Sequence, residues 1–148
     1  MGVFGLKADA ELGELLRNYS KETKRRKALS CVFREGEKTH GFYLILRGTV
    51  RLYMESKPGK KLMERVVGEG CLIGLPATVS GHPYSLTCEA VEDVELAYLS
   101  LRDFSNLMKC EGGAAMKLLR LLSSEVQAAR AEIARSPKPR NSTLSIAN

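Results

Sequence analysis

Tryptophan is absent from this chain, and histidine occurs only twice, at His40 and His82. Each histidine stands beside a glycine in a turn-like segment, and neither has a second metal ligand at a suitable spacing. No Ser-His-acid or Cys-His arrangement stands out that would favour nucleophilic catalysis. We therefore expect no metal site, no catalytic residue and no enzymatic activity.

Paired cysteines are also lacking. The four cysteines are scattered and form no C-x-x-C motif: Cys31, Cys71, Cys88 and Cys110. Three of them stand among apolar residues typical of strands, which favours buried free thiols over disulfides.

Long apolar runs are missing as well, since none approaches the roughly 20 residues that span a bilayer. The first residues, MGVFGLKADAEL, lack the basic and then apolar order of a secretory signal. The 148 residues suffice for one domain with its own core, and 44% hydrophobic with 27% charged residues is typical of a globular protein. We expect a cytoplasmic protein without a membrane partner.

Positive charge exceeds negative charge, because 23 Lys and Arg against 17 Asp and Glu give a net charge of +6. Much of the excess lies in two clusters, residues 21–27 and residues 135–140. Basic segments can attract phosphates, but no aromatic residues alternate with these charges as base stacking would require. We interpret the clusters as solvated surface and expect no direct nucleic-acid binding by this segment.

Residues 68–87, GEGCLIGLPATVSGHPYSLT, form what we call the glycine corner. Gly68, Gly70 and Gly74 break it, and glycine suits tight turns and close backbone approach to a ligand. Pro76 fits the first turn of a short helix, whose next N–H groups could hold an anion. The pattern predicts a strand, a corner and a helical turn around a ligand, with a plain β-barrel corner as the alternative.

Strand-like segments lie on both sides of the glycine corner. Residues 50–55 alternate apolar and polar side chains, and residues 57–60 favour a type II turn that leads to a hairpin partner. Further strands are predicted at residues 29–33, 42–46, 62–67, 85–91 and 94–101. Short strands at this spacing are typical of a β-sandwich or jelly roll.

Helices are predicted on either side of the strands. Asp9 is a candidate N-cap for a helix over residues 9–19. Ser100 and Asp103 have the spacing of a capping box for a helix over residues 101–110.

A long helix over residues 113–135 carries an a/d heptad seam: Ala115, Leu119, Leu122, Val126, Ala129 and Ile133. Leu118 and Leu121 widen its apolar surface, so one helix could contact both its own domain and a partner. We predict a homodimer through this seam. The alternative is a helix packed only on its own domain.

The order of motifs in FREGEKTHGFYLILRGTVRLYM and in the glycine corner resembles the Crp/Fnr family of bacterial transcription regulators. The resemblance covers residues 11–134, and Gly36, Gly48, Gly70 and Gly74 stand where that family has glycines. It implies a cyclic-nucleotide-binding effector domain that is mainly β with flanking helices, a double-stranded β-helix (jelly roll) followed by a long C-terminal dimerisation helix.

The resemblance also implies a division of the chain. Residues 1–136 would form the sensory domain, with the β-roll over about 28–101. Residues 137–148 would form a disordered linker towards a winged helix-turn-helix domain absent from this chain, through which DNA would be bound.

Two departures from the family pattern concern the ligand. Where cyclic-AMP-binding members carry a glutamate for the ribose and an arginine for the cyclic phosphate, this chain has Leu75 and Tyr84. The phosphate site is therefore interpreted as degenerate, with Arg65 or Arg130 as replacement cations. Candidate ligand-binding residues are Ile73, Gly74, Leu75, Pro76, Ala77, Tyr84, Ser85, Thr87, Arg65, Gln127 and Arg130.

The segment Ser80-Gly81-His82 is similar to a loop of the oxygen- and redox-sensing branch, but this chain lacks that branch's cysteine cluster. We expect no cofactor unless a cyclic nucleotide binds. Three hypotheses follow: a sensory and dimerisation domain for an unknown effector, which we prefer; a cyclic-nucleotide receptor with a rebuilt phosphate site; and a cupin-like enzyme, which two histidines in turns disfavour.

Overall fold

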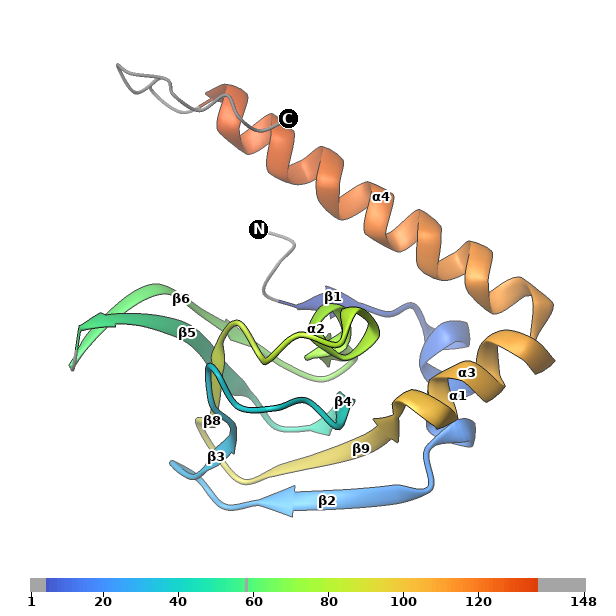
Figure 1. Cartoon of the computed structure of the whole chain (residues 1–148), viewed down its shortest axis with the longest axis horizontal. Helices are drawn as coiled ribbons and strands as arrows, with labels where there is room; N and C mark the ends of the chain where they lie inside the picture. The colour runs from blue at the N-terminus through green and yellow to red at the C-terminus, as the bar shows by residue number, and fades with distance from the viewer. Residues whose placement is uncertain (1–4, 58, 136–148) are drawn as a thin grey trace.

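Two antiparallel sheets wrap into a roll, and the first helix, the helix after the last strand and the start of the long C-terminal helix gather at one side of it (Figure 1). The computed structural model describes residues 5–57 and 59–135. The strands are β1 (Leu6–Lys7), β2 (Glu22–Arg26), β3 (Cys31–Phe33), β4 (Gly41–Arg47), β5 (Val50–Lys57), β6 (Lys60–Val67), β7 (Cys71–Ile73), β8 (Thr87–Ala90) and β9 (Val94–Ser100). The helices are α1 (Ala10–Tyr19), α2 (Leu75–Ser80), α3 (Leu101–Cys110) and α4 (Gly112–Arg135).

The strand order confirms the predicted jelly roll with flanking helices. One sheet runs β1-β7-β4-β9-β2 and the other β3-β8-β5-β6, so neighbours in space are mostly distant in sequence. The glycine corner connects the two sheets, because β7 belongs to the first and β8 to the second. The predicted turn at residues 57–60 includes Pro58, which lies outside the described residues.

The first sheet begins earlier than the sequence pattern predicts. The basic segment Glu22–Arg26 carries no apolar alternation, yet it forms β2 and pairs along its whole length with β9. β2 is an edge strand with exposed and half-buried side chains, so backbone hydrogen bonds rather than apolar burial hold it. The first strand of the second sheet is also shorter than expected, and starts at Cys31 rather than at residue 29.

Two apolar clusters fill the fold. The first lies inside the roll and is built on side chains such as Ile45, Leu52 and Leu96. The second lies between the first sheet and the helices, and contains Leu16 of α1, Leu107 of α3 and Leu118 of α4. From Phe42 to Ile45, successive residues of β4 contribute alternately to the second and the first cluster, as strand geometry requires.

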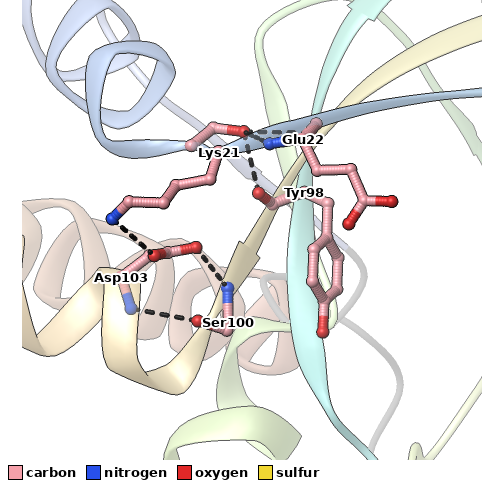
Figure 2. Close-up of polar contacts among 6 residues, drawn as sticks. Lys21, Glu22, Tyr98, Ser100 and Asp103 are labelled. Atoms are coloured by element: carbon pink, nitrogen blue, oxygen red, sulfur yellow. Dashed lines mark hydrogen bonds and ion pairs between the residues drawn. The ribbon is translucent and has the colours of Figure 1, made fainter.

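Both predicted helix starts are confirmed. The Asp9 carboxylate accepts a hydrogen bond from the Leu12 amide at 2.8 Å. At α3 the hydroxyl of Ser100 accepts from the Asp103 amide, and the Asp103 carboxylate accepts from the Ser100 amide, both at 3.1 Å. Figure 2 shows this capping box together with Lys21, whose ammonium group lies 3.4 Å from the Asp103 carboxylate.

Helix α4 packs at its base and then extends away from the strands (Figure 1). Ala114 and Leu118 are buried in the second cluster, and Leu122 packs partly against it. Leu119 and Val126 are 58% and 57% exposed. The side chains of Ala129 and Ile133 lie outside the described residues. In the described part of the chain, no helix is long and apolar enough to cross a bilayer.

Candidate functional site

The glycine corner turns through Gly74, whose φ of +83° is a conformation that side chains rarely adopt. The short helix α2 follows, with Pro76 in its first turn as predicted. A Cβ atom at position 74 would lie 3.0 Å from the Tyr84 ring and 3.4 Å from the Phe33 ring. Glycine therefore allows the backbone to lie directly against two aromatic side chains of the protein itself.

Tyr84 lies inside the roll and not on its surface, with 6% of its area exposed. Its ring stacks on Phe33 with centroids 3.9 Å apart and an interplanar angle of 11°. Its hydroxyl donates a 2.6 Å hydrogen bond to the carbonyl of Gly41. Burial, with Tyr43 and Tyr98 nearby, raises the pKa of Tyr84, so the phenol is neutral at physiological pH.

A cavity of about 130 Å³ remains at the glycine corner, and we call it the inner cavity. Its lining residues are Phe33, Leu52, Gly74, Pro76, Ala77, Tyr84, Ser85 and Leu86. None of these side chains carries a charge at neutral pH, so the lining offers an anion no cationic partner.

Five of the predicted ligand residues border this inner cavity: Gly74, Pro76, Ala77, Tyr84 and Ser85. Ile73 and Leu75 are buried in the first and second apolar clusters respectively. Thr87 is also buried, and its hydroxyl accepts a 2.9 Å hydrogen bond from the Glu35 amide. The structure thus gives Thr87 a role in holding the loop before β4.

The predicted cations lie outside the lining. Arg65 is exposed on β6, directly opposite Leu52 of β5. Gln127 and Arg130 are exposed on α4, which packs against α1, α3 and β1, and neither residue lines the inner cavity. Within a single chain, the structure does not bring the second half of α4 to the glycine corner.

Comparison with known proteins identifies the fold and its family. The profile of the family described as cyclic nucleotide-binding domain matches residues 23–110, more than half of the chain. The chain belongs to this family. The matched segment runs from β2 to the end of α3, and so contains the whole glycine corner.

Solved structures place this cyclic nucleotide-binding domain with the effector domains of Crp/Fnr regulators. The Catabolite Activator Protein of Thermus thermophilus is 26% identical with a TM-score of 0.74, over 84% of this chain and 58% of that chain. The N-terminal domain of a transcriptional regulator from Streptomyces coelicolor is 25% identical with a TM-score of 0.68, over 87% of this chain and 89% of that one.

One curated relative is named for a phospholipase domain and not as a transcription regulator. Patatin-like phospholipase domain-containing protein 6 of Homo sapiens is 28% identical over 96 residues, which is 65% of this chain. The matched part is only 7% of that much longer protein. The relationship is therefore confined to one segment of the phospholipase-domain protein.

Three residues that line the inner cavity are not among the predicted ligand residues: Phe33, Leu52 and Leu86. Each belongs to an apolar strand-like segment, and periodicity places such a residue on the buried face without saying what it faces.

Among the described residues, no three of His, Cys, Asp and Glu gather as a metal site would need.

Proposed function

We propose that this cyclic nucleotide-binding domain is a non-enzymatic sensory and dimerisation domain of a Crp/Fnr-type regulator, with a degenerate cyclic-nucleotide phosphate site. The observation that carries the proposal is the position of Tyr84. Its ring stacks on Phe33 within the roll, and its hydroxyl donates a hydrogen bond to the Gly41 carbonyl. At position 84 the family resemblance implies an arginine for a cyclic phosphate.

The size and charge of the inner cavity support this proposal. Small-molecule sites usually enclose about 300–1,000 Å³, whereas this cavity has about 130 Å³. An anionic ligand also needs charge-assisted hydrogen bonds, each contributing about 1.5–3 kcal/mol, and the lining contains no cation. A small uncharged effector suits the inner cavity better than a cyclic nucleotide does.

Leu75 couples the position of the glycine corner to the packing of the long helix α4. It follows Gly74 directly, and it is buried in the same apolar cluster as Leu107 of α3 and Ala114 and Leu118 of α4. An effector that moves α2 would therefore change the packing at the base of α4. In a longer polypeptide, such a change would alter the spacing of attached DNA-binding domains.

The exposed apolar side chains of α4 support dimerisation by a second copy of the chain. Ala114 and Leu118 face the chain's own core, while Leu119 and Val126 of the predicted seam are more than half exposed. Two such helices pairing along a heptad seam would bury these side chains.

The likeness to the phospholipase-domain protein does not lead us to propose an enzyme. It covers 7% of that protein, and the described residues offer no catalytic arrangement at the inner cavity.

A cyclic-nucleotide receptor with a rebuilt phosphate site is the second candidate, and the register of β5 and β6 favours it. Arg65 pairs with Leu52, and directly opposite residues of antiparallel strands project from the same face of the sheet. Since Leu52 lines the inner cavity, the Arg65 side chain projects from the face of the sheet that borders this cavity.

Calorimetric titration with cyclic AMP and cyclic GMP separates the two candidates. The proposal predicts no saturable binding at micromolar concentrations for the unmodified chain. Micromolar binding that Arg65→Ala abolishes would support the receptor instead and overturn the degenerate site. Arg102→Ala, which removes an exposed arginine of α3, is the matched control.

A further inference from the structure

A second hollow shares Phe33 and Tyr84 with the inner cavity but is otherwise lined by different residues. It has a volume of about 260 Å³, and we call it the outer recess. Its lining residues are Lys24, Val32, Phe33, Glu37, Lys38, His40, Tyr43, Tyr84 and Tyr98. Phe33 and Tyr84 also border the inner cavity, so the stacked pair is common to the two hollows.

Aromatic rings dominate the walls of the outer recess. Tyr43 lies with its centroid 5.3 Å from that of Tyr98 and 6.1 Å from that of Phe33. Such a cluster presents several ring faces and edges to one small volume, which suits a flat aromatic ligand.

Two of these phenols retain hydrogen-bonding capacity. Within the described residues, no protein group hydrogen-bonds to the hydroxyl of Tyr43 or Tyr98, although Tyr43 is only 6% exposed. Tyr43 and Tyr98 both border the outer recess, so their hydroxyls are placed to bond to a ligand there. Burial raises the pKa of Tyr43 to about 12, so its hydroxyl can donate a hydrogen bond at neutral pH.

Positive charge surrounds the rings. Two lysines, Lys24 and Lys38, border the recess with a single acid, Glu37, and His40 is also in its lining. The Lys24 ammonium group lies 4.5 Å from the centroid of Tyr98 and 3.9 Å from Glu22. Lys38 makes no hydrogen bond or ion pair with any residue that the structure describes, and its exposed ammonium group is available to a ligand.

The frame of the recess is fixed by contacts outside it. Figure 2 shows the backbone carbonyl of Tyr98 in the polar network while its ring projects away, with no contact drawn to its hydroxyl. The Ser20 hydroxyl donates to that carbonyl at 2.8 Å, and Lys21 is held by Asp103. These contacts fasten the start of β2, and with it Lys24, against β9.

We propose that the outer recess is a second binding site, for a small aromatic carboxylate. The ring of such a ligand would stack among Tyr43, Tyr98 and Phe33, and its carboxylate would accept hydrogen bonds from Lys38 and a phenol hydroxyl. The volume is below the range of drug-sized ligands, so the ligand has a single ring. This site does not depend on what the inner cavity binds.

Benzoate is the probe, and chemical-shift titration of the isotope-labelled chain is the measurement. We expect saturable shifts at residues of β2 and β9 with a Kd on the order of 1 mM, as befits a ligand of so few atoms. Lys38→Gln should weaken binding about tenfold, because it removes a charge-assisted hydrogen bond from an exposed side chain without touching the core.

Controls distinguish this site from general charge attraction and from the inner cavity. Lys109→Gln removes an exposed lysine elsewhere and should leave the Kd unchanged, as should Ala77→Leu, which fills only the inner cavity. Cyclohexanecarboxylate, with the charge but no aromatic ring, and benzyl alcohol, with the ring but no charge, should each bind at least several-fold more weakly. The proposal is overturned if benzoate gives no saturable shift, if Lys38→Gln changes nothing, or if Ala77→Leu abolishes binding.

Discussion

At position 84 a phenol is buried against Gly74, with its hydroxyl 2.6 Å from the carbonyl of Gly41. Tyr84→Phe keeps the stack on Phe33 and leaves that buried carbonyl without this donor. We expect the free energy of unfolding to fall by about 1–2 kcal/mol, measured by urea denaturation. Tyr98→Phe removes a hydroxyl that bonds to no described residue, and should change stability by less than half as much. Equal losses in the two variants would contradict the assigned hydrogen bond.

The phenols of the roll also predict how stability depends on alkaline pH. Desolvation by burial raises the pKa of Tyr43 from 10.0 to about 12. Above pH 10 the unfolded chain releases this proton before the folded chain does, so stability is present below pH 10 and is lost as pH rises towards 12. Tyr43 should account for about 1 kcal/mol of the loss between roughly pH 9 and pH 11.

Urea denaturation of the unmodified chain and of Tyr43→Phe at these two pH values measures that share. The variant should lose less stability over the interval than the unmodified chain. Identical losses would show that the Tyr43 pKa is not raised by folding.

The surroundings of a residue can be predicted from the sequence only where its near neighbours in the chain determine them. Leu75 and Pro76 are neighbours in a helix of six residues, yet Pro76 borders the inner cavity and Leu75 lies in the second apolar cluster. The choice depends on which side of α2 faces the second apolar cluster, and no local pattern carries that information. For the same reason, the stacking of Phe33 on Tyr84 could not be read from positions 51 residues apart.

Among the elements, the start of α3 combines two roles in one short segment. Ser100 ends β9 and caps α3, and Asp103 both completes the capping box and holds Lys21 (Figure 2). Ser100→Ala should reduce the free energy of unfolding by about 1 kcal/mol, because the Asp103 amide loses its acceptor. Ser105→Ala, an exposed change in the same helix, is the matched control for calorimetric unfolding. A loss no greater than in the control would contradict the cap.

The elements themselves were predictable to different degrees. The capping box, the strand–turn–helix order of the glycine corner and the β5–β6 hairpin follow from local chemistry, and the structure confirms them. β2 was missed because Glu22–Arg26 has the composition of a solvated segment and becomes a strand only by pairing with β9. β1 was missed as well, since two residues, Leu6 and Lys7, are too few for any periodicity.

In the whole molecule, one face of α4 packs against the chain's own core and another face is exposed. Leu118 is 9% exposed and Leu119 is 58% exposed, although they are adjacent. Leu119→Asp should therefore disrupt a dimer while leaving the folded chain intact, whereas Leu122 packs partly against the chain's own core. We expect sedimentation to show a dimer for the unmodified chain and a monomer for Leu119→Asp.

Ser124→Asp places the same charge at another exposed position of α4 and should remain dimeric. A monomer for the unmodified chain at high protein concentration would contradict dimerisation through the α4 seam. The borders of the sensory domain at residues 1–136, and the tail at residues 137–148, stay predictions, because residues 1–4 and 136–148 lie outside the described part of the chain.

Thermal unfolding of the unmodified chain with cyclic AMP or cyclic GMP tests whether the phosphate site is degenerate. A ligand at about 100 times its Kd stabilises the folded state by about 2.7 kcal/mol, which would raise the melting temperature by several degrees. Because Tyr84 fills the corner and the inner cavity offers no cation, we predict no shift beyond error at about 1 mM of either nucleotide. A rise of several degrees would contradict the account.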